Sequence, residues 1–164
     1  MIRVRVDKQV LIETLAATVR AELAEAKRLA KETADAANHP EARPEGDKDT
    51  RKIELSYLAA GQAARASELE SGLLLIATLP ARRFGKHEPI QAGALVELDV
   101  EGKPQRVLLS PAGGGMKLAD MRGTINVVTP QSPLGKNLLG RTIGDSFELV
   151  VAGQSREVEI LSVA

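Results

Sequence analysis

DKQVLIETLAATVRAELAEAKRLAKETADAAN, residues 7–38, sets the architecture of the first half of the chain because it lacks Gly and Pro. Apolar or small residues recur in it in steps of three and four, which places them on one face of an α-helix. They are Leu11, Leu15, Val19, Leu23, Ala26, Ala30, Thr33 and Ala37. At ~1.5 Å per residue this helix is a rod of roughly 45 Å, too long for a small domain to enclose.

A second helical pattern follows a polar turn. The first helix must end near His39 because Pro40 disfavours a helical conformation in the residue before it. The second pattern runs from about Thr50 to Leu79, with apolar residues expected on its buried face at Ile53, Tyr57, Ala60, Ala64, Leu69, Leu73 and Ile76. In both helices the apolar side chains become smaller toward the turn. The pattern predicts an antiparallel coiled-coil finger over residues 1–79, with its tip at about 39–50.

The composition changes after Pro80, where Gly, Pro, Val and Ile become frequent. Alternating segments at 95–100, 106–109, 124–128, 146–151 and 156–163 indicate strands of an antiparallel or mixed sheet. Between them, residues 132–140 have a helix N-cap at Ser132, a proline at the first helical position and a terminating glycine. We therefore expect an α+β protein, with a sheet domain and one short helix over residues 80–164.

Composition excludes several classes of function. The chain has no Cys, so thiolate metal sites are excluded. It has only two His and 22 basic against 22 acidic residues, and this balance removes the simplest argument for direct binding of nucleic acid, a clustered excess of Lys and Arg. Three aromatic residues are too few for base stacking or for an aromatic-lined pocket. No nucleophile, base and orienting group can be assembled into an enzyme site. Without a secretory signal or a membrane-spanning run, we expect a cytoplasmic protein that is not itself an enzyme.

The segment TPQSPLGKNLLGRTIGD, residues 129–145, resembles the C-terminal signature of the GreA/GreB transcript-cleavage factors. The final strand at 157–163 is similar to the end of that family, and residues 56–62 resemble its Glu-Tyr-x-Ala-Ala-Lys-Glu motif on the second coiled-coil helix. The resemblance covers nearly the whole chain. It implies a coiled coil that enters the secondary channel of bacterial RNA polymerase and an FKBP-like domain seated at the channel rim.

At the tip the sequence departs from that family, whose members carry Gly-Asp-x-x-Glu there. Gly46 and Asp47 match the first two positions, but Thr50 stands where the glutamate belongs; alignment from Tyr57 without a gap puts Thr50 and Ile53 at the two acidic positions. Glu45, Asp47 and Asp49 remain candidate ligands for a Mg²⁺ shared with the polymerase active site. The alternative is that Asp47 and Asp49 only cap the second helix.

By the same resemblance, the loop and short helix after Thr129 form the docking surface for the polymerase rim. The candidate contact residues there are Ser132, Pro133, Leu134 and Leu138. Ser132 is equally suited to helix capping, and Leu138 to packing on the sheet.

The expected function is that of a transcription elongation factor, a monomer that binds RNA polymerase and reaches nascent RNA and DNA only indirectly. One version stimulates cleavage of backtracked RNA, and the other occupies the secondary channel as a regulator or inhibitor without stimulating cleavage. A third reading, from another class, is a coiled-coil interaction adaptor unrelated to transcription.

Overall fold

The computed structural model describes residues 7–39 and 47–164, and for residues 47–49 it describes the backbone alone. The chain forms two compact units. One contains helix α1 up to Ala16 together with the chain from Leu74 onward, and the other contains residues 17–73. This division differs from the predicted boundary at residues 79/80, because the ends of both long helices belong with the sheet. Within the described residues no helix is long and apolar enough to cross a membrane.

Helix α1 runs from Lys8 to Asn38, close to the predicted bounds. Asp7 caps it, because its Oδ1 accepts hydrogen bonds from the backbone N–H groups of Gln9, at 3.0 Å, and Val10, at 3.5 Å. Every residue predicted for its inner face is buried or half-buried. The helix ends before Pro40, as the sequence predicts.

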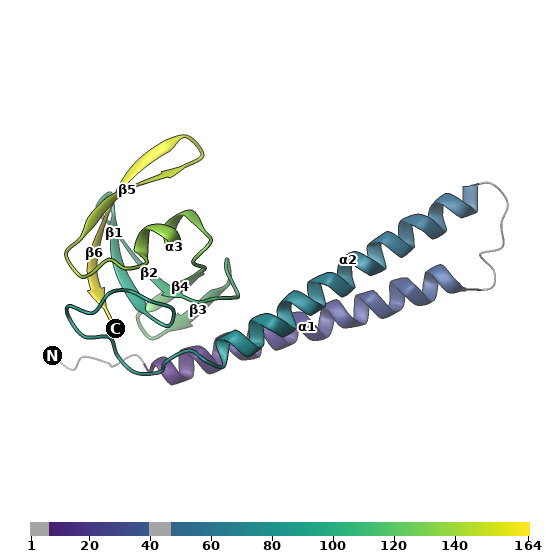
Figure 1. Ribbon diagram of the computed structural model, residues 1–164, viewed down its shortest axis with the longest axis horizontal. Coiled ribbons are helices and arrows are strands. Elements are labelled where there is room, and N and C mark those ends of the chain that lie inside the picture. The colour runs from purple at the N-terminus through teal and green to yellow at the C-terminus, as the bar shows by residue number, and fades with distance from the viewer. Residues whose placement is uncertain (1–6, 40–46) are drawn as a thin grey trace. The chain divides into compact units, whose positions relative to one another are not determined.

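Helix α2 runs from Asp47 to Ile76 and lies antiparallel to α1 (Figure 1). Two cross-helix ion pairs join the helices within residues 17–73: Arg65 with Glu22 at 3.2 Å, and Lys27 with Glu70 at 2.6 Å. All four side chains are largely exposed, so each pair contributes at most about 1 kcal/mol. The apolar seam between the helices is therefore the main source of stability in the finger.

The predicted inner face of α2 is wrong over its first half. Ile53 and Tyr57 are 56% and 76% exposed, and Ala60 and Ala64 are exposed as well. The buried or half-buried positions are Leu55, Ala59, Gln62, Ala66, Leu69, Leu73 and Ile76. These follow one another in steps of four and three without a break, whereas the predicted set contains a step of five between Ala64 and Leu69. The continuous seam is the one that can face a partner helix along its whole length.

The sheet has six strands in the order β3-β4-β2-β1-β6-β5 (Figure 1). Their bounds are β1 Leu95–Val100, β2 Lys103–Leu109, β3 Lys117–Asp120, β4 Gly123–Val128, β5 Ser146–Val151 and β6 Gln154–Val163. All neighbouring strands are antiparallel except β2 and β4, which are parallel. The sheet is thus mixed, and the predicted α+β class is confirmed. The sequence did not predict β3, a short edge strand with a single buried residue, Leu118.

The core cluster of the sheet unit lies on the face that carries Val96, Leu98 and Val100 of β1. Leu138 of helix α3, which spans Pro133–Leu138, completes this cluster. Alternate residues of the strands, including Leu95 and Leu108, are also buried. Because strand side chains alternate between faces, both faces of the sheet carry buried apolar residues.

An ion-pair network ties β1 and β2 to the turn between β3 and β4. Arg106 donates two hydrogen bonds to the carboxylate of Asp120, at 2.6 and 2.7 Å, and this contact lowers the pKa of Asp120. Arg122 pairs with Glu97 at 2.5 Å. The Arg106 side chain is only 10% exposed, so its charge depends on these carboxylates.

Candidate partner-binding surface

Helix α3 carries the predicted docking residues, and its conformation follows from local sequence. Ser132 is the N-cap: its Oγ accepts a hydrogen bond from the Gly135 N–H at 3.0 Å. The same hydroxyl donates to the Thr129 carbonyl at 2.8 Å. Pro133 occupies the first turn, where its missing N–H costs nothing. Ser132 therefore uses its hydroxyl for capping, which leaves the surface to its neighbours.

Gly135 sets how closely α3 approaches the preceding loop. A Cβ at this position would lie 1.9 Å from the carbonyl oxygen of Thr129 and 2.7 Å from its carbonyl carbon. Both atoms belong to the backbone and cannot move aside as a side chain can. The glycine thus allows the loop and the helix to present one continuous surface.

The far end of α3 is fixed to the sheet unit. The Gly140 N–H donates to the Ile90 carbonyl at 2.9 Å, and the Ile90 N–H donates to the Arg141 carbonyl at 2.8 Å. Arg141 also donates from Nε to the Asn137 carbonyl at 2.6 Å, and its guanidinium lies 4.8 Å from the centre of the Phe147 ring. The helix is anchored at both ends, so its exposed side chains have defined positions.

The four predicted contact residues differ in exposure. Pro133 is exposed, while Ser132 and Leu134 are half-buried, and Leu134 packs partly against the core. Leu138 is fully buried, so its prediction as a direct contact needs correction: it supports the surface from beneath. Leu139, which the sequence analysis did not select, is 42% exposed. The apolar surface available to a partner at α3 consists of Pro133, part of Leu134 and Leu139.

At the finger tip the structure gives only the backbone of part of the candidate site. Glu45 lies outside the described residues, and α2 begins at Asp47, so Asp47 and Asp49 occupy its first turn. Among the described residues no group of three potential metal ligands occurs.

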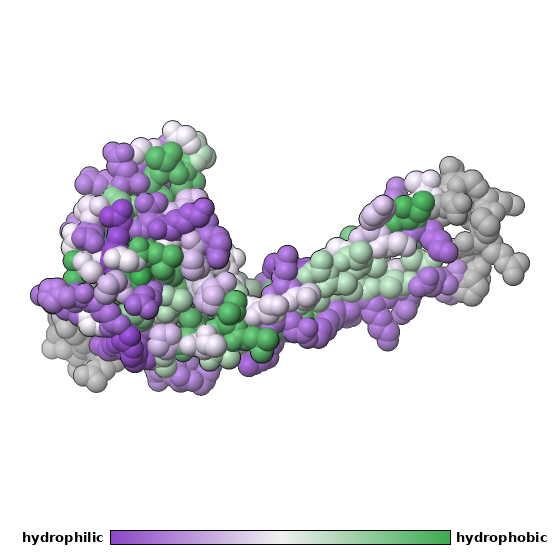
Figure 2. All heavy atoms as spheres, in the orientation of Figure 1, coloured by the Kyte–Doolittle hydropathy of each residue, from purple (hydrophilic) through white to green (hydrophobic). Residues whose placement is uncertain are grey.

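The outer face of α2 just after the tip is apolar. Ile53, Tyr57 and Leu58 are each more than half exposed. Figure 2 shows hydrophobic side chains on this part of the finger, next to the residues drawn in grey. Thr50 and Ile53, which take the two acidic positions in the ungapped alignment with the GreA/GreB motif, are both exposed.

Comparison with known families confirms the predicted resemblance over the C-terminal segment. Residues 116–164 match the family described as Transcription elongation factor, GreA/GreB, C-term. This range contains strands β3 to β6 and helix α3, and therefore the whole candidate docking surface. No curated protein matches the chain.

Solved structures similar to the chain include GreA factor homolog 1 (Gfh1) of Thermus thermophilus, at 23% identity over 93% of this chain and 94% of that one, with a TM-score of 0.38. Gfh1 of Thermus aquaticus is 22% identical over 92% of each chain, with a TM-score of 0.39. GreA/GreB from Nitrosomonas europaea is 22% identical over 60% of this chain and 78% of that one, with a TM-score of 0.36.

Proposed function

We propose that the chain is a transcription factor of the GreA/GreB type that binds RNA polymerase, inserts its helical finger into the secondary channel and modulates elongation. The observation that carries this proposal is the match of residues 116–164 to the GreA/GreB C-terminal family. The long helical finger that precedes this segment supports it. In this proposal the polymerase supplies all the catalysis. Since bacterial RNA polymerase acts in the cytoplasm, the proposed site of action is also the cytoplasm.

Docking is assigned to the α3 surface. Its apolar side chains stand on a helix that is capped by Ser132 and anchored through Gly140, so little conformational freedom is lost when a partner binds. A charge placed at the half-buried Leu134 would have to be desolvated at a cost of a few kcal/mol. We therefore expect Pro133→Ala with Leu134→Asp to weaken binding to purified RNA polymerase at least tenfold.

The binding experiment uses a matched control. Glu148→Lys changes the charge of an exposed residue on β5 and leaves α3 intact. It should bind polymerase as the wild type does, and both variants should keep the wild-type circular dichroism spectrum. Unchanged binding of the α3 double variant would refute this docking surface. If the wild-type chain does not bind purified polymerase at near-physiological salt, the proposed function is wrong. The hypothesis that then remains is a coiled-coil interaction adaptor unrelated to transcription.

One feature of the tip favours a factor that occupies the channel without stimulating RNA cleavage. Thr50 and Ile53 stand at the acidic positions in the ungapped alignment. A weakly held Mg²⁺ requires more than one hard oxygen ligand. Under the alternative, Asp47 and Asp49, with Glu45, would help to hold the second Mg²⁺ of the polymerase and so promote hydrolysis there.

Backtracked polymerase complexes with Mg²⁺ distinguish these versions, because only a stimulator shortens the RNA from its 3′ end. We expect the wild-type chain to bind and to change the elongation rate without accelerating cleavage. Asp47→Asn with Asp49→Asn keeps the capping ability of both residues and removes their charge. If the wild type accelerates cleavage and this variant does not, the two aspartates are metal ligands and the non-cleaving version is wrong.

A further inference from the structure

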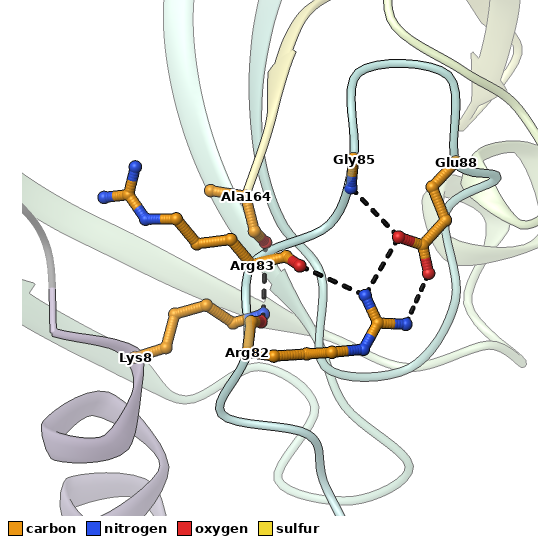
Figure 3. A network of polar contacts seen from close by, with 6 residues as sticks. All are labelled: Lys8, Arg82, Arg83, Gly85, Glu88 and Ala164. Carbon is orange, nitrogen blue, oxygen red and sulfur yellow. Dashed lines mark hydrogen bonds and ion pairs between the residues drawn. The ribbon is translucent and has the colours of Figure 1, made fainter.

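The loop between α2 and β1, residues 81–89, is braced from within although it contains no helix or strand. The guanidinium of Arg82 pairs with the carboxylate of Glu88, and Arg82 also donates to the Arg83 carbonyl at 3.1 Å (Figure 3). The Oε2 atom of that carboxylate, which accepts one of the Arg82 hydrogen bonds, also accepts the Gly85 N–H at 2.9 Å, and the Glu88 N–H donates to the Gly85 carbonyl at 3.0 Å. We call residues 81–89 the braced loop.

Lys8 secures the braced loop to the start of α1. Its Nζ donates to the Arg82 carbonyl at 2.7 Å and to the main-chain oxygen of Ala164 at 3.1 Å (Figure 3). Nζ also lies 4.6 Å from the centre of the Phe84 ring, and Phe84 is buried. Lys8 itself is 4% exposed. Lys8 therefore holds the loop at Arg82 and Phe84. Glu88 holds its two ends together through Arg82 and Gly85.

The charged side chains that the braced loop presents outward are those of Arg83 and Lys86. Both are exposed, as is the neighbouring His87, and within the described part of the chain none of these three side chains forms a hydrogen bond or an ion pair. In Figure 3 the Arg83 side chain points away from the brace. With Lys8 and Arg82, the loop and its support hold four lysine and arginine side chains against one carboxylate, Glu88. Lys8 is buried and Arg82 is paired with Glu88, so Arg83 and Lys86 carry the positive charge that faces outward.

A chain segment can connect a helix to a strand without the contacts that Arg82 and Glu88 make inside this loop. The ion pair between Arg82 and Glu88 is in contact with solvent, so it adds little to stability. Its effect is to hold the backbone of the loop in one conformation, so that the Cα atoms of Arg83 and Lys86 stand at fixed positions. A surface prepared in this way loses less conformational entropy when it binds a ligand.

We propose that the braced loop is a docking surface for an acidic segment of a partner protein. The outward cations attract carboxylates, and the Arg83 guanidinium can bind one of them through two parallel hydrogen bonds. Nucleic acid fits less well, because a phosphate backbone requires a longer row of cations and the phenyl ring of Phe84 is buried. This surface is separate from α3, and the proposal does not depend on polymerase binding.

Fluorescence anisotropy with the full chain and a labelled hexaglutamate peptide tests the proposal at low salt. Arg83→Glu with Lys86→Glu should weaken binding at least tenfold. The control, Lys103→Glu with Arg156→Glu, makes the same change in net charge at exposed residues of the same unit and should lose less than threefold. Equal losses in the two variants would show that only net charge matters and would overturn the proposal. So would tighter binding of a single-stranded oligonucleotide than of the peptide.

The Glu88→Gln variant distinguishes positioning of the loop by the Arg82–Glu88 contact from attraction of the peptide by net charge alone. The substitution removes the ion pair with Arg82 and raises the net charge by one, so attraction alone predicts tighter binding of hexaglutamate. If the brace positions the cations, binding should instead weaken about threefold or more, with the circular dichroism spectrum unchanged. Binding that is equal to or tighter than that of the wild type would refute the preorganised surface.

Discussion

Replacing Gly135 by alanine should displace helix α3 from its packed position, because the added Cβ would lie 1.9 Å from the carbonyl oxygen of Thr129. Since the nearest atoms are backbone, relief requires α3 or the loop before it to move by more than about 1 Å. Overpacking of this kind costs roughly 1–3 kcal/mol. Movement also weakens the hydrogen bond between Ser132 Oγ and the Gly135 N–H, worth roughly 0.5–2 kcal/mol as a helix cap.

The combined loss is about 1.5–5 kcal/mol in the free energy of unfolding of the sheet unit. For a protein of this size it lowers Tm by roughly 3–20 °C. Differential scanning calorimetry measures this shift, and fits with two transitions allow for separate unfolding of the two units. Because Pro133 and Leu134 move with α3, binding to RNA polymerase should weaken as well.

Gly61→Ala is the matched control. Gly61 is exposed in the middle of α2, and a Cβ there meets nothing within 4 Å. This change should stabilise the finger by about 0.5–1 kcal/mol because alanine favours the helix. A Gly135→Ala protein with the stability of the wild type, within about 0.5 kcal/mol, would contradict the close packing of α3 described above.

Three further perturbations give expected outcomes. Burial, followed by the charges of Arg82 and Arg83, lowers the pKa of Lys8 from 10.5 to about 8. The unfolded chain therefore binds more protons between about pH 8 and about pH 10, so stability should rise with pH across this window, by at most about 3 kcal/mol. Below about pH 8 Lys8 is protonated in both states, and its contribution to stability no longer changes with pH. Urea unfolding of the wild type and of Lys8→Met should show the rise only in the wild type. Asp120→Ala should cost about 3 kcal/mol in chemical unfolding, since it leaves the Arg106 charge nearly buried without its main partner, whereas a loss below about 1 kcal/mol would mean that Glu97 suffices. Leu15→Ala, at a fully buried position of α1, should cost about 2–5 kcal/mol by calorimetry, while Val10→Ala, at a 54% exposed position, should stay within about 0.5 kcal/mol.

Helix α1 could be predicted almost residue by residue because a single apolar stripe runs along it and Asp7 and Pro40 delimit it. Helix α2 carries two apolar stripes, and local periodicity cannot tell which one meets α1. The continuous steps from Leu55 to Ile76 contain that information, but only when the whole helix is considered at once.

Other features depend on contacts that no local pattern reveals. Lys8 reads as a surface lysine at a helix start, and its partners at Arg82 and Ala164 are 74 and 156 residues away. The need for glycine at position 135 arises from the return of the Thr129 backbone toward the helix. Strand β3 is short and has one buried residue, so its pairing with β4 defines it more than its sequence does.

The distribution of aromatic residues gives each unit its own spectroscopic reporter. Tyr57 is the only tyrosine, tryptophan is absent, and Tyr57 lies in the unit of residues 17–73. Both phenylalanines, Phe84 and Phe147, lie in the other unit and are buried. Tyrosine emission and near-ultraviolet tyrosine bands therefore report on the finger, and the phenylalanine fine structure at shorter wavelengths reports on the sheet unit. The melting of the two halves can be followed separately in the unlabelled wild-type protein.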